Sequence, residues 1–137
     1  SFFSLSKLSS IIFNSVNFYG QNKELYFIEP QDGEKLTNPI RVKFGLSGFG
    51  VAPAGVLKEN TGHHHLLIDV ANLPDFDKPI PATENHIHFG GGQTETVISL
   101  AKGPHTLQLL LGDAYHIPLN PVLLSEKITI YVIEQNN

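Results

Sequence analysis

The sequence predicts an all-β fold, an immunoglobulin-like antiparallel β-sandwich of about seven strands. Two observations lead to this prediction. Short segments that alternate apolar and polar residues recur after residue 22, and clusters of proline, glycine and asparagine separate them. The chain contains neither cysteine nor tryptophan, so we expect a sandwich without the disulfide core of antibody domains.

Alternation locates each strand. In residues 40–47, Ile40, Val42 and Phe44 share one face, and charged residues occupy the other. The expected strands are residues 24–29, 40–47, 63–70, 86–89, 94–100, 106–113 and 125–134. Residues 71–85 contain three prolines, so we expect a loop there and not a central strand.

Residues 1–22 are expected to form an N-terminal extension, separate from a sandwich domain at residues 23–137. The extension has no acidic residue, and its apolar positions predict an amphipathic helix within residues 2–19. These positions are Phe2, Leu5, Leu8, Ile12, Val16 and Tyr19. We expect residues 1–20 to pack against a protein partner or a membrane-associated assembly, because an apolar face left in water favours aggregation. The alternative is the flank of a removed signal or transit peptide.

Composition narrows the classes of function. A chain of 137 residues with 41% apolar and 16% charged residues is typical of one globular domain. The net charge is −4 and the nine lysines and arginines are scattered singly, so we expect no nucleic-acid partner. The sequence contains no run of 18 apolar residues, so we expect no membrane-spanning helix. Since the chain begins at Ser1 and contains no methionine, we expect that a targeting segment has been removed.

Catalysis has little support in the sequence. Without cysteine, the chain has no thiol nucleophile and no cysteine ligands for zinc. No serine lies in a Gly-x-Ser-x-Gly motif, and no close pair of carboxylates suggests glycosidase chemistry. We therefore expect a protein that is not an enzyme.

Three consecutive histidines carry the strongest functional signal, in the stretch "GHHHLLID" at residues 62–69. Successive side chains of a strand point to opposite faces. His64 therefore joins the apolar face that continues with Leu66, and His63 and His65 lie together on the other face. This arrangement leaves two imidazoles side by side and outside the predicted core.

A second histidine pair follows in "HIHF" at residues 86–89. Because Ile87 and Phe89 form the apolar face, His86 and His88 share the opposite one. The two residues of such a pair are about 6–7 Å apart, so both rings can lean toward one ion.

These pairs predict a site for a transition metal, because imidazole is a usual ligand of zinc and copper and needs no thiolate beside it. The candidate metal ligands are His63, His65, His86, His88, His105 and His116. Two other interpretations stay open. The histidines could hold the sandwich together through hydrogen bonds, or they could form a proton-transfer or ligand-binding site.

Polar residues near these strands are candidates for orienting the histidines. The glycines at 90–92 predict a tight bend, which would bring Gln93 and Glu95 near the pairs. Asp69 is a third candidate of this kind. Asp113 could play the same part, but we favour a simpler one, in which it caps the turn after the strand at 106–112.

Several blocks of this sequence resemble one family. "GHHHLLID", "PIPATENHIHFGGGQTE", "KGPHTLQLLLGD" and "SEKITIYV" are similar to the small bacterial exported proteins of domain-of-unknown-function family 4399, over residues 24–133. The resemblance implies an exported, sandwich-like domain with a histidine-rich site and no established activity. It places His63, His65, His86, His88, His105 and His116 in that site.

The resemblance weakens after Asp113. Family members often read Asp-His-x-His-x-Pro-His there, whereas this chain reads "DAYHIPLNP", with Ala114 and Leu119 at positions where histidine is expected. If those histidines are ligands elsewhere, the site in this chain has fewer of them.

We therefore expect an extracytoplasmic domain, periplasmic or secreted, that binds copper or zinc without catalysis. An organelle lumen is the alternative location. One competing hypothesis is an accessory subunit, docked through residues 1–20 onto a larger membrane-associated assembly, in which the histidines are structural. Another is a metal-dependent enzyme with three histidine ligands and an open coordination position.

Overall fold

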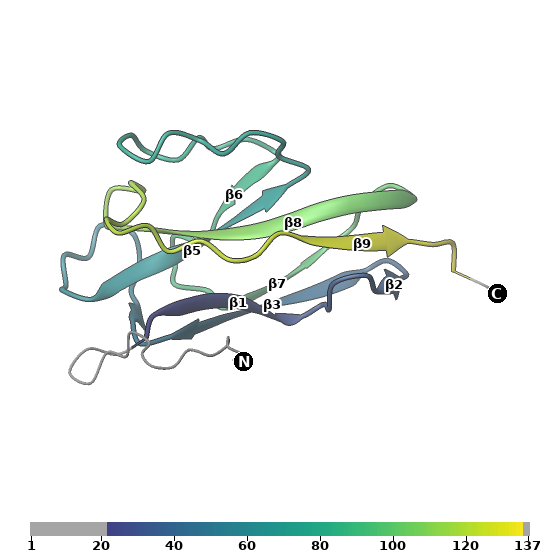
Figure 1. Ribbon diagram of the computed structural model, residues 1–137, viewed down its shortest axis with the longest axis horizontal. Coiled ribbons are helices and arrows are strands. Elements are labelled where there is room, and N and C mark those ends of the chain that lie inside the picture. The colour runs from purple at the N-terminus through teal and green to yellow at the C-terminus, as the bar shows by residue number, and fades with distance from the viewer. Residues whose placement is uncertain (1–21, 136–137) are drawn as a thin grey trace, which may run out of the picture.

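The strands form two sheets packed face to face in this computed structural model, which describes residues 22–135 (Figure 1). The three-stranded sheet has the order β1 (Glu24–Glu29), β3 (Ile40–Ser47) and β7 (Glu95–Ile98). The six-stranded sheet has the order β2 (Lys35–Leu36), β9 (Ile128–Val132), β8 (Gly103–Gly112), β5 (Thr61–Ile68) and β4 (Gly50–Val51), and β6 (His86–His88) also pairs with β5. The predicted all-β sandwich is confirmed.

All seven predicted strands are present, and β1 and β3 have the predicted bounds. Strand β5 ends at Ile68, two residues earlier than predicted, because Asp69 adopts a left-handed backbone conformation with φ of 56°. The two-residue strands β2 and β4 were not predicted. Each joins the six-stranded sheet by a parallel pairing, β2 to β9 and β4 to β5.

The predicted N-terminal helix lies outside the described residues. Within residues 22–135, the structure contains no helix that is long and apolar enough to cross a membrane.

The main core lies between the two sheets, as alternation requires. From the three-stranded sheet, Val42 and Phe44 point inward and are almost completely buried. From the six-stranded sheet, the inward residues include Leu66 of β5 and Leu109 of β8. The β5–β8 pair is antiparallel, with Leu66 opposite Leu109, and it forms the centre of the core.

The outer face of the six-stranded sheet is also covered. Leu67 of β5 and Leu110 of β8 point away from the main core and form a second apolar cluster with Ile80, which belongs to the 71–85 loop. In Figure 1 this loop runs above β5 and β8, on the side opposite the three-stranded sheet. Both faces of β5 are therefore buried.

His64 lies in the main core, as predicted from strand alternation. Its ring is fully buried and packs against Phe44, with the ring centroids 4.9 Å apart. Neither ring nitrogen has a hydrogen-bond partner among the described residues. Burial, and after it the nearby His63, lower the pKa of His64 from 6.5 to about 4. His64 is therefore neutral at physiological pH and destabilising relative to an apolar residue.

Replacing His64 by leucine should stabilise the metal-free protein, most strongly in acid. The unfolded chain binds the His64 proton at higher pH than the folded protein does, because the folded pKa is the lower one. Protonation of His64 in the unfolded chain therefore has little effect on stability above pH 6.5, and it lowers the free energy of unfolding of the wild type as pH falls from 6.5 to about 4, by about 3 kcal/mol. Denaturant unfolding of the wild type and His64→Leu across this pH range measures the difference.

The matched control is His105→Leu. Both ring nitrogens of His105 have partners, Asp69 and the Ala101 carbonyl, each at 2.7 Å. His105→Leu removes these two hydrogen bonds and should lower the free energy of unfolding, whereas His64→Leu should raise it. Equal losses from the two substitutions would show that His64 is not an unsatisfied core residue.

Candidate metal centre

Four histidine rings meet on the outer face of the six-stranded sheet. His63 and His65 come from β5, and His88 comes from β6, where it lies directly opposite His65 in the antiparallel register. His116 comes from the turn after β8. As predicted, each His-x-His pair lies on one face, and β5 and β6 are adjacent.

The ring nitrogens of three neighbours converge on Nδ1 of His116. The distances to that atom are 2.9 Å from Nε2 of His63, 3.3 Å from Nε2 of His65 and 3.0 Å from Nδ1 of His88. One ligand nitrogen from each of His63, His65 and His116 lies within 4.8 Å of the other two. A tetrahedral ion with metal–nitrogen bonds of 2.0–2.1 Å separates its ligand nitrogens by about 3.3–3.4 Å. The spacing around His116 is close to that value.

Hydrogen bonding alone does not account for this convergence. A neutral imidazole has one N–H donor and one acceptor nitrogen, and each nitrogen makes one hydrogen bond in the ring plane. Of the three nitrogens near Nδ1 of His116, only one can therefore be bonded to it through a proton. A cation at the centre of the group would satisfy all of the converging lone pairs at once.

Burial keeps these rings neutral. His63 and His65 are completely buried, and His116 is half-buried. Burial, and then the neighbouring histidines, lower the pKa of His63 to about 4 and that of His65 to about 2. Burial also lowers the pKa of His116, against a smaller opposing effect of Asp113. Neutral imidazole is the form that binds metal, so these rings remain able to bind a metal ion below pH 6.5.

The Nδ1 atoms of His63 and His65 are buried and have no hydrogen-bond partner among the described residues. Since no hydrogen bond at Nδ1 holds these rings, packing orients them. Two glycines make the necessary room. A Cβ on Gly112 would lie 2.5 Å from Cε1 of His65, and one on Gly62 would lie 2.6 Å from the carbonyl oxygen of Gly112. The β5 and β8 backbones can thus approach each other while the imidazoles occupy the space above them.

Asp113 builds the turn that presents His116. One of its carboxylate oxygens accepts hydrogen bonds from the backbone N–H groups of Tyr115 at 2.8 Å and Ile117 at 3.0 Å. His116 itself has a left-handed backbone, with φ of 65°, and its N–H donates to the Asp113 carbonyl at 3.0 Å. The simpler role favoured from the sequence, in which Asp113 caps the turn, is confirmed.

Two of the six predicted ligands lie outside the cluster. His86 bonds through Nδ1 to the Thr83 hydroxyl at 2.8 Å, and His105 donates a hydrogen bond from Nδ1 to the Asp69 carboxylate at 2.7 Å. Burial lowers the pKa of His105, but its hydrogen bonds to Asp69 and the Ala101 carbonyl outweigh this effect and raise the pKa overall. His116, which the sequence also named as a candidate ligand, lies in the cluster with His63, His65 and His88.

None of the residues predicted to orient the site does so. Asp69 bonds to His105, which is outside the cluster. The glycine bend turns the next residues away: Gln93 accepts a hydrogen bond from the Gly91 N–H at 3.0 Å, and Glu95 pairs with Arg41 at 3.6 Å. The sequence missed the group that does support a ring, the Pro81 carbonyl, which accepts from Nε2 of His88 at 2.7 Å. A backbone carbonyl in a loop has no sequence signal.

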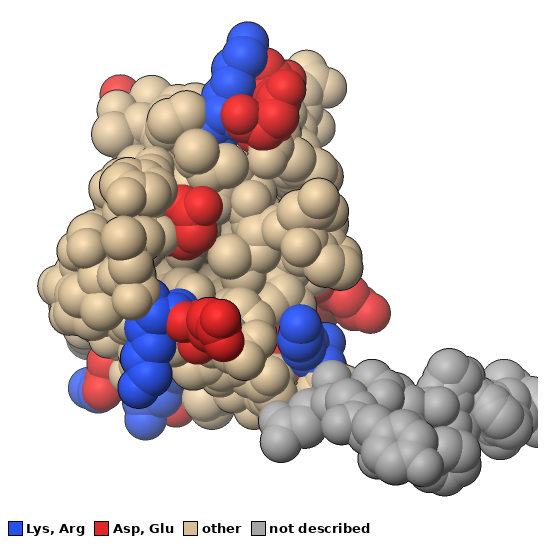
Figure 2. Space-filling view, turned by 90° about the vertical axis from the view of Figure 1, so that its left-hand side faces the viewer, with Lys and Arg blue, Asp and Glu red and all other residues tan. Residues whose placement is uncertain are grey.

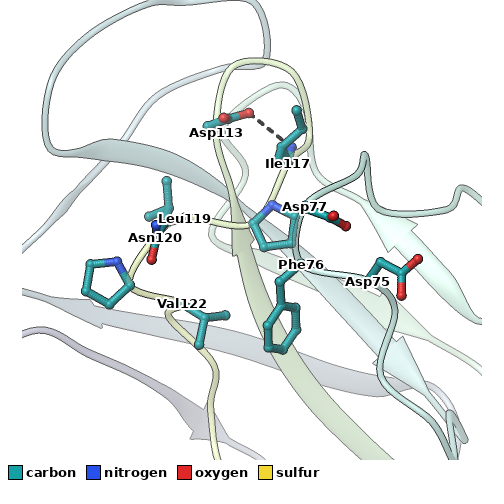
Figure 3. Close-up of a pocket in the computed structure, with 10 residues that line it drawn as sticks. Asp75, Phe76, Asp77, Asp113, Ile117, Leu119, Asn120 and Val122 are labelled. Atoms are coloured by element: carbon teal, nitrogen blue, oxygen red, sulfur yellow. Dashed lines mark hydrogen bonds between the residues drawn. The ribbon is translucent and has the colours of Figure 1, made fainter.

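A groove of about 880 Å³ lies beside the His116 turn, between the 75–77 and 117–122 segments (Figure 3). Asp113 borders it, and Figure 3 shows that residue bonded to the Ile117 backbone. Figure 2 shows this end of the molecule, where an acidic group lies within a hollow of otherwise uncharged surface. None of the described residues that line the groove is a histidine. Asp113 and Ile117 of the turn that carries His116 line the groove.

The family of the chain follows from its sequence. A family model described as a domain of unknown function (DUF4399) matches residues 42–133. The chain belongs to the DUF4399 family. The matched region contains all four histidines of the cluster. No curated protein and no solved structure gives a significant match to this DUF4399 domain.

Ala114 and Leu119, the positions where the resemblance leads us to expect histidine, have other contacts in this structure. The Ala114 carbonyl accepts a hydrogen bond from the Gly55 N–H at 2.9 Å, and the Leu119 side chain packs against the main core. The His116 turn therefore contributes one imidazole to the cluster.

A Gly112→Ala substitution should displace His65. The added methyl group would overlap the imidazole at Cε1, and the backbone of Gly112 has no positive φ that would strain alanine by itself. We expect a loss of about 1–3 kcal/mol in the free energy of unfolding, measured by denaturant titration. Gly90→Ala is the control, because its Cβ would make only ordinary contacts, with Ala54 at 3.4 Å and with Cε1 of His116 at 4.0 Å. Equal effects would contradict this account of Gly112.

Proposed function

We propose that this domain binds one transition-metal ion, copper or zinc, through Nε2 of His63, Nε2 of His65 and Nδ1 of His116, and that it does so without catalysis. The observation that supports this most directly is the group of three mutually close imidazole nitrogens, two of them fully buried. An all-imidazole set suits zinc and copper, whereas magnesium and calcium prefer oxygen ligands.

The main alternative, a purely structural histidine network, agrees less well with the contacts. Structural histidines generally satisfy both ring nitrogens, as His105 does with Asp69 and Ala101. His63 and His65 instead leave Nδ1 unpartnered among the described residues. Each unmet buried group costs about 1–3 kcal/mol. That cost is common to both interpretations, which differ at Nε2. An ion would engage the Nε2 atoms of His63 and His65 together, whereas Nδ1 of His116 can share a proton with only one of them.

The proposal predicts one tightly bound metal ion per chain. The untagged protein, purified without added metal or chelator, should contain near-stoichiometric copper or zinc by elemental analysis. After metal removal, titration calorimetry should show one site. Loss of a residue that only supports a ligand typically lowers metal affinity by roughly 10–100-fold. His63→Ala removes a ligand itself, so it should lower the affinity by more than that.

His86→Ala is the matched control, since His86 is a histidine of the same short strand as His88 but bonds to Thr83. It should bind metal as the wild type does. A wild-type protein that takes up no ion would refute the proposal. An equal loss of affinity in the two variants would assign the binding to other residues.

Metal binding should resist mild acid. Exposed histidines become protonated below about pH 6.5 and lose metal there. The pKa values of His63 and His65 are lowered to about 4 and about 2, and that of His116 is also lowered, so protons compete less with metal at pH 6 than they do at exposed histidines. We expect an affinity that is nearly constant from about pH 7.5 to about pH 6 and falls as pH approaches about 4. Competition with a chromophoric chelator measures it, and a steep loss centred on pH 6.5 would contradict the prediction.

A further inference from the structure

His88 differs from the other histidines of the cluster in having a fixed tautomer. Its Nε2 lies 2.7 Å from the Pro81 carbonyl oxygen. A carbonyl only accepts hydrogen bonds, so Nε2 carries a proton, and in the neutral ring Nδ1 carries the lone pair. That lone pair lies 3.0 Å from Nδ1 of His116. His88 is not among the residues whose ligand nitrogens all lie within 4.8 Å of one another, which are His63, His65 and His116, so its ring would have to shift toward the ion to bind it.

A metal ligand usually has such a partner for its second nitrogen. The N–H of a metal-bound imidazole commonly donates to a carboxylate or backbone carbonyl, which fixes the ring and raises its basicity. Among the four rings, His88 has a carbonyl in that position, whereas His63 and His65 have no partner at Nδ1 within the described chain.

The 71–85 loop is attached to the cluster at two consecutive residues. The Ile80 N–H donates to the His116 carbonyl at 2.8 Å, and the Pro81 carbonyl accepts from His88. The buried Ile80 side chain packs on the outer face of the six-stranded sheet. Residues 75–77 of the same loop line the groove beside the His116 turn.

We propose that His88 is a fourth ligand of the metal, and that its ligation fastens the 71–85 loop over the centre. This inference rests on the proposed function, because it needs an ion bound by His63, His65 and His116. Coordination at Nδ1 draws electron density from the ring and makes the Nε2 proton a stronger donor. The hydrogen bond to Pro81 is thereby strengthened, and metal occupancy controls how often the loop opens.

Hydrogen exchange on the full chain, with and without Zn²⁺, tests the inference. If opening of the loop breaks the His88 bond to the metal, a free Zn²⁺ concentration of 100 times Kd suppresses that opening about 100-fold. In the wild type we expect slowing that approaches this factor at the hydrogen-bonded backbone amides of Ile80, Thr83 and His86. In His88→Ala, the ion stays bound by the other three histidines, and the slowing of these amides is lost.

Each other outcome has a definite reading. If His88→Ala retains the Zn²⁺-dependent slowing, or binds Zn²⁺ with the affinity of the wild type, the inference is overturned. If the wild type binds no Zn²⁺ by calorimetry, the proposed function has failed, and that result is known before any exchange experiment. Should His88→Ala not fold, as judged by circular dichroism, His88→Gln takes its place. Glutamine can still donate an amide N–H to Pro81 but offers no imidazole.

Discussion

Apolar residues cover β5 on both sides, with the three-stranded sheet on one face and the 71–85 loop on the other. Every residue from Gly62 to Ile68 is buried as a result. A strand in this position ordinarily consists of aliphatic residues, because a buried polar group without a partner is costly. Three histidines occupy this strand, and the environment of their ring nitrogens differs between its inner and outer faces.

The inner and outer histidines of β5 show this difference. His64, on the inner face, packs as an aromatic ring against Phe44 and leaves both nitrogens unsatisfied. His63 and His65, on the outer face, direct Nε2 toward His116. A strand held on both edges by β8, β4 and β6 cannot move to relieve these positions. The two outer rings thus form a rigid base, and the turn carrying His116 and the short strand β6 complete the cluster from above.

Much of this arrangement could be predicted from the sequence because strand alternation is a strong local signal. It determined the bounds of β1 and β3 and the common face of His63 and His65. Strand alternation could not show that His116 lies beside this pair, because His116 is 53 residues away from His63 in the sequence. Its position is set by a left-handed turn that Asp113 stabilises. Two-residue strands such as β2 have too few positions to show alternation at all.

The separation between His63 and His116 has a further consequence in a chain that contains no cysteine. An ion bound by both residues closes a loop of 53 residues, much as a disulfide would. By the chain-entropy relation used for disulfides, closing a loop of that length restricts the unfolded state by about 4 kcal/mol at room temperature. Unlike a disulfide, this cross-link is insensitive to thiol reductants and is removed by a chelator. Loss of the ion would release the ends of a long loop as well as empty a site.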